Sequence, residues 1–158
     1  MQNLSKRPLT IPDDPFTCIF VDVIPNPAVP GLYVSTTFPF SLLVVEPRSK
    51  FKWFLGMIDA TTETIIETLQ QYRADIQNLT NTHELSYIRT DAGSQFLSTE
   101  FRDYCRQNQI NLTCAASKHQ EMNAYCESTW RNISTMARSM LVHADLSLHF
   151  FMKLNAMQ

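Results

Sequence analysis

The spacing of apolar residues along the chain changes character near residue 60. Before that point, three apolar runs, 17–24, 40–47 and 51–58, are separated by segments rich in Pro and polar residues. Short runs bounded by turn residues are typical of β-strands, and the almost unbroken run 17–24 suits a strand buried on both faces of a sheet. We therefore predict three strands in this part of the chain, the last two joined by the turn 47–50.

After residue 60 the apolar period lengthens to that of a helix. A helix over 61–79, capped by Thr61 or Thr62, would carry its apolar side chains on one stripe, which consists of Ile65, Ile66, Leu69, Tyr72, Ile76 and Leu79. Strands are predicted over 84–91 and 110–116. Between them a short helix over 98–109, capped by Ser98, would turn inward the side chains of Phe101, Tyr104 and Cys105.

The last part of the chain predicts two helices. A long helix over about 122–144 would have one buried stripe, formed by Cys126, Trp130, Ile133, Ala137, Met140 and Leu141. The segment 146–157 reads as the start of a further helix. The order of elements is thus three strands, a helix, a strand, a helix, a strand and two helices, which favours an α/β fold with a mixed five-stranded sheet flanked by helices.

Composition and charge narrow the classes of protein. A length of 158 residues, 44% hydrophobic and 11% aromatic, fits one globular domain over 15–158 after an extended linker over 1–14. No apolar run reaches the length of a membrane span and the N-terminus lacks a signal-peptide pattern, so we expect an intracellular protein. The four cysteines show no metal-binding spacing. A net charge of −2 indicates that nucleic-acid binding would need metal ions, a local basic strip or further domains.

Two carboxylates stand out, one inside a predicted strand and one at the end of another. Asp22 interrupts an apolar run, where a charge is costly unless it is paired, binds a metal or reaches solvent at the strand end. Asp91 ends another strand in the segment IRTDAGSQF, where Asp and Gly93 also suit a simple turn. If the two strands are parallel neighbours, the carboxylates lie side by side and repel unless a divalent cation lies between them.

Glu127 is the third candidate acid. Thirty-five residues lie between Asp91 and Glu127, but the same spacing separates Glu67 from Asp103, so spacing alone decides nothing. Glu67 and Asp103 fall on polar faces of ordinary amphipathic helices, whereas Glu127 borders the buried stripe of the long helix. Arg131, one turn later, makes a surface ion pair with Glu127 an alternative interpretation.

These acids and the final helix resemble the catalytic core of retroviral and retrotransposon integrases, with the ribonuclease H-like fold and its Asp, Asp, Glu (DDE) triad. The copia-type group is most similar. The stretches that carry the resemblance are DAGSQF, HQEMNAYCE and above all ARSML followed by a Leu-x-x-x-Phe segment, and the resemblance covers roughly residues 15 to 157. Ala92 stands where the family usually has Asn, and Ala124 where it usually has Gly.

The resemblance implies a site and a reaction. Asp22, Asp91 and Glu127 would hold two Mg²⁺ or Mn²⁺ ions about 3.5–4 Å apart. The enzyme, a polynucleotidyl transferase, would trim DNA 3′ ends with water and then join the 3′-hydroxyl to target DNA. The segment 117–125 would be a mobile loop over the site. The candidate nucleic-acid contacts, Lys118 and Arg131 foremost for phosphates, are Lys118, His119, Gln120, Asn123 and Arg131.

Further expectations follow from the same resemblance. The family's zinc-binding and basic DNA-binding modules are missing from the sequence, so we expect a core alone, truncated at its C-terminal helix, from a degenerate or split element. An active form would be a nuclear homo-oligomer that binds element ends and target DNA and no membrane. Two alternatives stay open: an inactive relic or domesticated domain that still binds nucleic acid, and a nuclease on the same fold that hydrolyses without joining.

Overall fold

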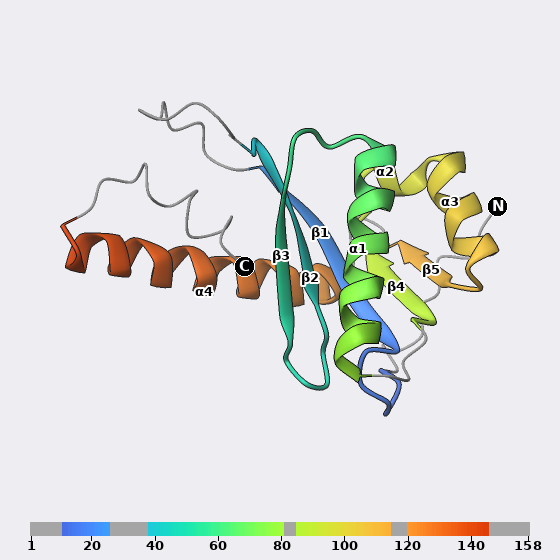
Figure 1. Ribbon diagram of the computed structural model, residues 1–158, viewed down its shortest axis with the longest axis horizontal. Helices are drawn as coiled ribbons and strands as arrows, with labels where there is room; N and C mark the ends of the chain where they lie inside the picture. Colours follow the sequence, from blue (N-terminus) through green and yellow to red (C-terminus); the bar gives the residue numbers. More distant parts are fainter. Residues whose placement is uncertain (1–10, 26–37, 81–84, 115–119, 146–158) are drawn as a thin grey trace.

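A mixed five-stranded sheet forms the centre of the domain (Figure 1). The computed structural model describes residues 11–25, 38–80, 85–114 and 120–145. The strand order is β3-β2-β1-β4-β5, with antiparallel pairs β1–β2 and β2–β3 and parallel pairs β1–β4 and β4–β5. The predicted mixed sheet is confirmed, with strands β1 (Cys18–Pro25), β2 (Phe40–Val45), β3 (Lys52–Met57), β4 (Tyr87–Thr90) and β5 (Asn111–Cys114).

The helices begin where the sequence offers capping groups. In α1 (Thr62–Thr80), the Thr61 hydroxyl accepts a hydrogen bond from the Thr64 backbone N–H at 3.3 Å. In α3 (Thr99–Gln107), Ser98 accepts one from the Phe101 N–H at 3.2 Å, as predicted. Each side chain satisfies a backbone donor that has no partner inside its helix. The short helix α2 (Ser94–Leu97), just before α3, was not predicted.

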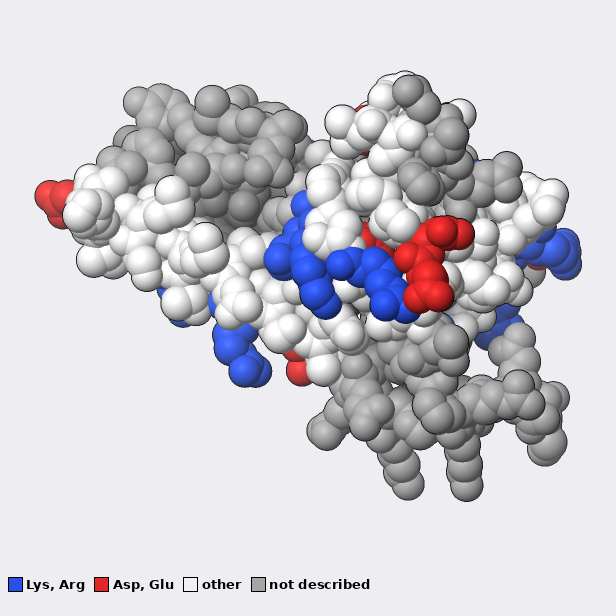
Figure 2. All heavy atoms as spheres, turned by 90° about the horizontal axis from the view of Figure 1, so that it is seen from below, with Lys and Arg blue, Asp and Glu red and all other residues white. Residues whose placement is uncertain are grey.

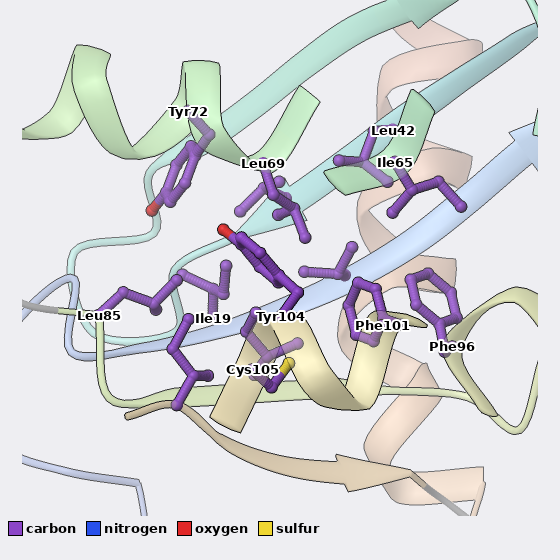
Figure 3. Close-up of a cluster of buried hydrophobic side chains, with 14 of the residues drawn as sticks. Ile19, Leu42, Ile65, Leu69, Tyr72, Leu85, Phe96, Phe101, Tyr104 and Cys105 are labelled. Atoms are coloured by element: carbon purple, nitrogen blue, oxygen red, sulfur yellow. The ribbon is translucent and has the colours of Figure 1, made fainter. Parts of the chain in front are cut away.

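Most of the core lies on the face of the sheet that α1 and α3 cover (Figure 3). Alternate residues of β1 and β2 point to this face, as the two-residue repeat of a strand requires. They pack against the apolar stripes of α1 and α3, whose predicted inward residues Phe101, Tyr104 and Cys105 are buried. Rings add edge-on contacts, such as Phe96 against Phe101 at 5.2 Å.

The opposite face carries α4 (Gln120–His143), a helix of 24 residues. Its buried cluster consists of Phe20, Ile24, Leu43, Val45 and Cys126, with Trp130 and Ile133 packed against it. In Figure 1, α4 crosses behind the sheet and continues past its edge. The face under α4 is therefore only partly covered.

Three predictions about element ends and stripes were wrong. Leu79 is 70% exposed, because the stripe of α1 continues into a last turn that no described residue covers. Met140, in the last turn of α4, is 58% exposed, whereas Leu141 beside it is buried. The long helix starts at Gln120 rather than near Met122, so six of the nine residues of the predicted loop 117–125 are helical. The predicted helix 146–157 and the end of the predicted strand 110–116 lie outside the described residues.

The predicted N-terminal linker is tied to the sheet at its end. Arg48, in the turn between β2 and β3, donates hydrogen bonds to the carbonyl oxygens of Ile11 and Pro12, each at 2.9 Å. Its guanidinium also pairs with the Asp13 carboxylate at 2.6 Å. Residues 11–13 are thereby fixed beside the β2–β3 turn. None of the helices in the described residues is long and apolar enough to span a membrane.

Candidate functional site

The parallel pairing of β1 and β4 brings the two predicted aspartates together. Cys18 lies opposite Tyr87 and Val21 opposite Thr90, so one further step along the register sets Asp22 opposite Asp91. Asp22 shares its face of the sheet with Phe20 and Ile24, which belong to the cluster under α4. The first and fourth strands are parallel neighbours, which is the condition under which the sequence places the two carboxylates side by side. Both carboxylates thus lie just past the point where the pairing of β1 with β4 ends, while β1 continues to Pro25 beside β2.

Asp22 sits in an environment that disfavours its charge. The pKa of Asp22 is raised to about 7, first by burial and then by the negative charges of Asp91 and Glu127, while a hydrogen bond from the Val23 backbone N–H opposes the shift. Among the described residues, no ion pair compensates the Asp22 carboxylate. The salt-bridge alternative for Asp22 therefore finds no support, and the mutual repulsion expected between neighbouring carboxylates is present.

Asp91 combines the two interpretations that the sequence left open. One carboxylate oxygen, Oδ1, accepts a hydrogen bond from the Gly93 backbone N–H at 3.0 Å, the geometry of an Asx-turn. Gly93 has a φ of −57°, so this position uses no left-handed conformation. What it needs is space, because a Cβ at Gly93 would lie 3.0 Å from Oδ1 of Asp91. Turn formation thus orients the carboxylate without using both of its oxygens.

Glu127 lies on α4 above the two aspartates. Cys126, one residue earlier, is 1% exposed, and burial together with the charges of Asp22, Asp91 and Glu127 raises the pKa of its thiol. Glu127 itself is exposed and borders the buried stripe, as predicted. Arg131 is also exposed, and no ion pair joins these two described side chains. The surface-pair interpretation of Glu127 and Arg131 is therefore not supported.

The three acids supply the oxygen donors that hard divalent cations prefer. The charges of Asp91 and Glu127 raise the electrostatic cost of ionising Asp22, so a cation near these carboxylates would relieve that cost. Within the described residues, however, no three His, Cys, Asp or Glu side chains lie close enough together to hold a metal ion. The carboxylates therefore sense one another's charge without converging on one point. The chemistry fits Mg²⁺ or Mn²⁺, which need only one or two carboxylates besides water and phosphate.

The predicted nucleic-acid contacts are less well placed. Lys118 and His119 lie outside the described residues, and the side chains of Gln120 and Asn123, in the first turn of α4, are not described either. Arg131 is exposed on α4, one turn after Glu127. On the face shown in Figure 2, basic side chains form small groups next to acidic ones rather than one broad basic surface.

Sequence reasoning missed a chain of ring and cation contacts beside the acids. The rings of Phe20 and Tyr125 stack with centroids 4.8 Å apart. The Lys50 ammonium lies 5.5 Å from the Tyr125 ring centre, and the Arg89 guanidinium carbon lies 5.8 Å from that of Phe20. The four residues come from four different elements. Only the position of Phe20 and Arg89 two residues before each aspartate gave a signal in the sequence.

Comparisons with known proteins agree with this architecture. No protein-family model and no curated protein sequence matches the chain. A solved structure that does match is a chain of the simian T-cell lymphotropic virus intasome in complex with the PP2A regulatory subunit B56 gamma, with a TM-score of 0.68 and 18% sequence identity. The match covers 89% of this chain and 47% of that chain, so the present domain spans about half of its length. The chain therefore has a ribonuclease H-like α/β fold similar to that of a retroviral integrase.

Proposed function

We propose that this domain is a retrotransposon-type integrase core of the copia group, which processes DNA 3′ ends and joins them to target DNA. The observation that carries the proposal is the position of Asp22 and Asp91 on neighbouring parallel strands, with Glu127 close enough to raise the pKa of Asp22. Three acids with no compensating ion pair among the described residues favour a site for divalent metal over a purely structural role. The integrase-like fold supports the same conclusion.

In this proposal Asp22, Asp91 and Glu127 hold Mg²⁺ or Mn²⁺. The ions would lower the pKa of an attacking water or hydroxyl and neutralise charge on the phosphate. The chain's own residues orient the site: the Gly93 N–H holds one oxygen of Asp91, and the Cys126 thiol keeps the base of Glu127 anchored in the apolar cluster. Arg131 is the described side chain that we assign to a DNA phosphate, and an oligomer in the nucleus would be the active form.

The test compares the three acids with two matched controls. Each variant, Asp22→Asn, Asp91→Asn and Glu127→Gln, should abolish Mn²⁺-dependent cleavage and joining of a short DNA duplex with a recessed or blunt end. Glu67→Gln and Asp103→Asn repeat the same sequence spacing on α1 and α3 and should leave both reactions unchanged. Equal activity in all five variants would contradict the proposal.

A second function is favoured by one observation. Because the described acids do not converge to form a metal site, a domain that binds nucleic acid without catalysis is the alternative. It predicts DNA binding, followed by fluorescence anisotropy, that is the same with Mn²⁺ as with EDTA and no strand cleavage. Cleavage without joining would instead indicate a nuclease on this fold.

A further inference from the structure

Two cationic side chains and two aromatic rings make a series of contacts beside the three acids. These contacts join β1, β4 and α4, the elements on which or just after which the acids lie. The contacts run from Lys50 in the β2–β3 turn, to Tyr125 in α4, to Phe20 in β1 and to Arg89 in β4. We call these four residues the cation–aromatic chain. Stacked rings and cations over ring faces are attractive at these separations. The chain is therefore a direct physical link between the hairpin, the helix and the two central strands.

The position of this chain relative to the acids is regular. Phe20 precedes Asp22 by two residues and Arg89 precedes Asp91 by two, which in an extended strand puts both members of a pair on the same face. Tyr125 precedes Glu127 by two, a rise of about 3 Å along the helix. On the helix the Tyr125 and Glu127 side chains point about 200° apart, so Tyr125 acts on Glu127 through the backbone of α4 rather than by side-chain contact. A shift of α4 against the sheet would move Glu127 only if the stack between Tyr125 and Phe20 also moved.

The conformation of Lys50 is an independent observation. Its φ of 63° is in the left-handed region, which favours Gly or Asn and is costly for a Lys. The hairpin around it is firmly closed: the Glu46 N–H donates to the Phe51 carbonyl at 2.8 Å, and the buried Glu46 carboxylate accepts the Arg48 N–H at 2.9 Å. Hairpin closure alone would be better served by Gly. Only a long cationic side chain at this position reaches over the Tyr125 ring.

From these observations we infer that the cation–aromatic chain is a positioning device, which sets the height and angle of Glu127 above Asp22 and Asp91. The inference rests on the proposed metal role of the three acids. Its key residues are Lys50, which contacts α4 from the exposed β2–β3 turn, and Tyr125, through which α4 contacts Phe20 of the sheet. They act through Glu127 and touch neither metal nor substrate. Groups that hold ligands in place are a regular part of metal sites.

The chain offers a matched control for ordinary packing. Phe54 of β3 stacks on Trp130 of the same helix, with centroids 5.8 Å apart and ring planes at 15°. This second stack also joins α4 to the sheet, but Phe54 lies on β3, which carries none of the three acids. A substitution in either stack should lower the stability of the domain. Only one in the cation–aromatic chain should weaken metal binding.

The experiment titrates the full chain with Mn²⁺ and follows free Mn²⁺ by its electron paramagnetic resonance signal, next to thermal unfolding. Tyr125→Leu should weaken Mn²⁺ binding about tenfold, the lower end of the effect of groups behind metal ligands. Tyr125→Phe keeps the ring and should restore binding to within about twofold of the parent, since stacking needs no hydroxyl. Phe54→Leu should lower the melting temperature and leave Mn²⁺ binding unchanged. Amide hydrogen exchange over 124–132 should quicken in Tyr125→Leu.

Lys50→Gly separates positioning from stability, also if Tyr125→Leu fails to fold. It removes the left-handed strain, so the melting temperature should stay the same or rise, while Mn²⁺ binding weakens about threefold with the loss of the cation over the ring. Unchanged binding in both Tyr125→Leu and Lys50→Gly, or the same loss in Phe54→Leu, would overturn the inference. A parent that binds no Mn²⁺, alone or with a DNA duplex, would refute the metal role in the proposed function and the inference with it.

Discussion

The two faces of the sheet bury side chains of different kinds. Under α1 and α3, sixteen of the described residues form one cluster that is apolar apart from the hydroxyl groups of its two tyrosines. Under α4, the buried cluster has five members, and partly buried rings, cations and the acids surround it. Because apolar burial supplies most of the free energy of folding, the first face should carry the stability. The stability that the first face provides can then offset the cost of holding charged groups on the second face.

The largest expected effect tests where the stability lies. Phe101→Ala empties a fully buried position under α3 and should lower the free energy of unfolding by about 3–5 kcal/mol. Phe54→Ala, at a partly buried ring under α4, should cost roughly half as much, since less surface returns to water. Chemical denaturation measures both. Equal losses in the two variants would contradict the claim that the face under α1 and α3 carries most of the stability.

The second effect concerns the charge that the α4 face holds. The pKa of Asp22 is raised to about 7 in the folded protein, so between pH 4 and pH 7 the folded state retains a proton that the unfolded state releases. The free energy of unfolding should therefore fall as pH rises through this window, by on the order of 2 kcal/mol. Asp22→Asn should remove this fall and stabilise the protein at pH 7. Asp103→Asn, which breaks a surface pair with Arg106, serves as the control.

A decrease that persists in Asp22→Asn would assign the pH dependence to other groups. Added Mn²⁺ should also reverse the fall in the parent, because a cation favours the charged carboxylate. The α4 face would then be destabilising only while its charges lack a counterion.

The smallest expected effect on stability belongs to Gly93→Ala. The added Cβ would crowd Oδ1 of Asp91 and the side chain of Gln95, whose flexible end can move aside. The free energy of unfolding should change by less than about 1 kcal/mol, as for most substitutions outside the core. Mn²⁺ binding should weaken several-fold in the same titration, because Asp91 must turn. A large loss of stability with normal binding would show that Gly93 serves the fold rather than the site.

Much of the fold could be predicted, because the spacing of apolar residues identifies the buried face of each helix and strand. The stripes Ile65, Leu69, Tyr72 and Phe101, Tyr104 were predicted correctly, and the almost unbroken apolar run 17–24 is the central strand β1. Periodicity does not state what lies opposite a face, so Leu79 and Met140 were wrongly placed in the core. The short helix α2 makes tertiary contacts that no local pattern records, among them the buried Phe96 ring and a hydrogen bond from the Thr62 hydroxyl to the Gln95 carbonyl.

The site was predictable in part. The sequence made the neighbouring positions of Asp22 and Asp91 depend on a pairing of their strands, which the structure supplies, whereas their metal binding stays a prediction. The contact of Lys50 with Tyr125 joins residues 75 positions apart, through a turn that looked like an ordinary PRSK loop. Its left-handed backbone cannot be read from a sequence in which Lys occupies the place of Gly. Long-range ring contacts of this kind leave no periodic trace.

The buried thiol of Cys126 can report how often α4 separates from the sheet. Its side chain is 1% exposed, and burial with the three nearby carboxylates raises its pKa, so the nucleophilic thiolate is scarce at neutral pH. An alkylating reagent can reach it only when α4 lifts from the sheet. The rate at which Cys126 is alkylated therefore measures the frequency of these openings. A cation or DNA that holds α4 against the sheet should lower this rate.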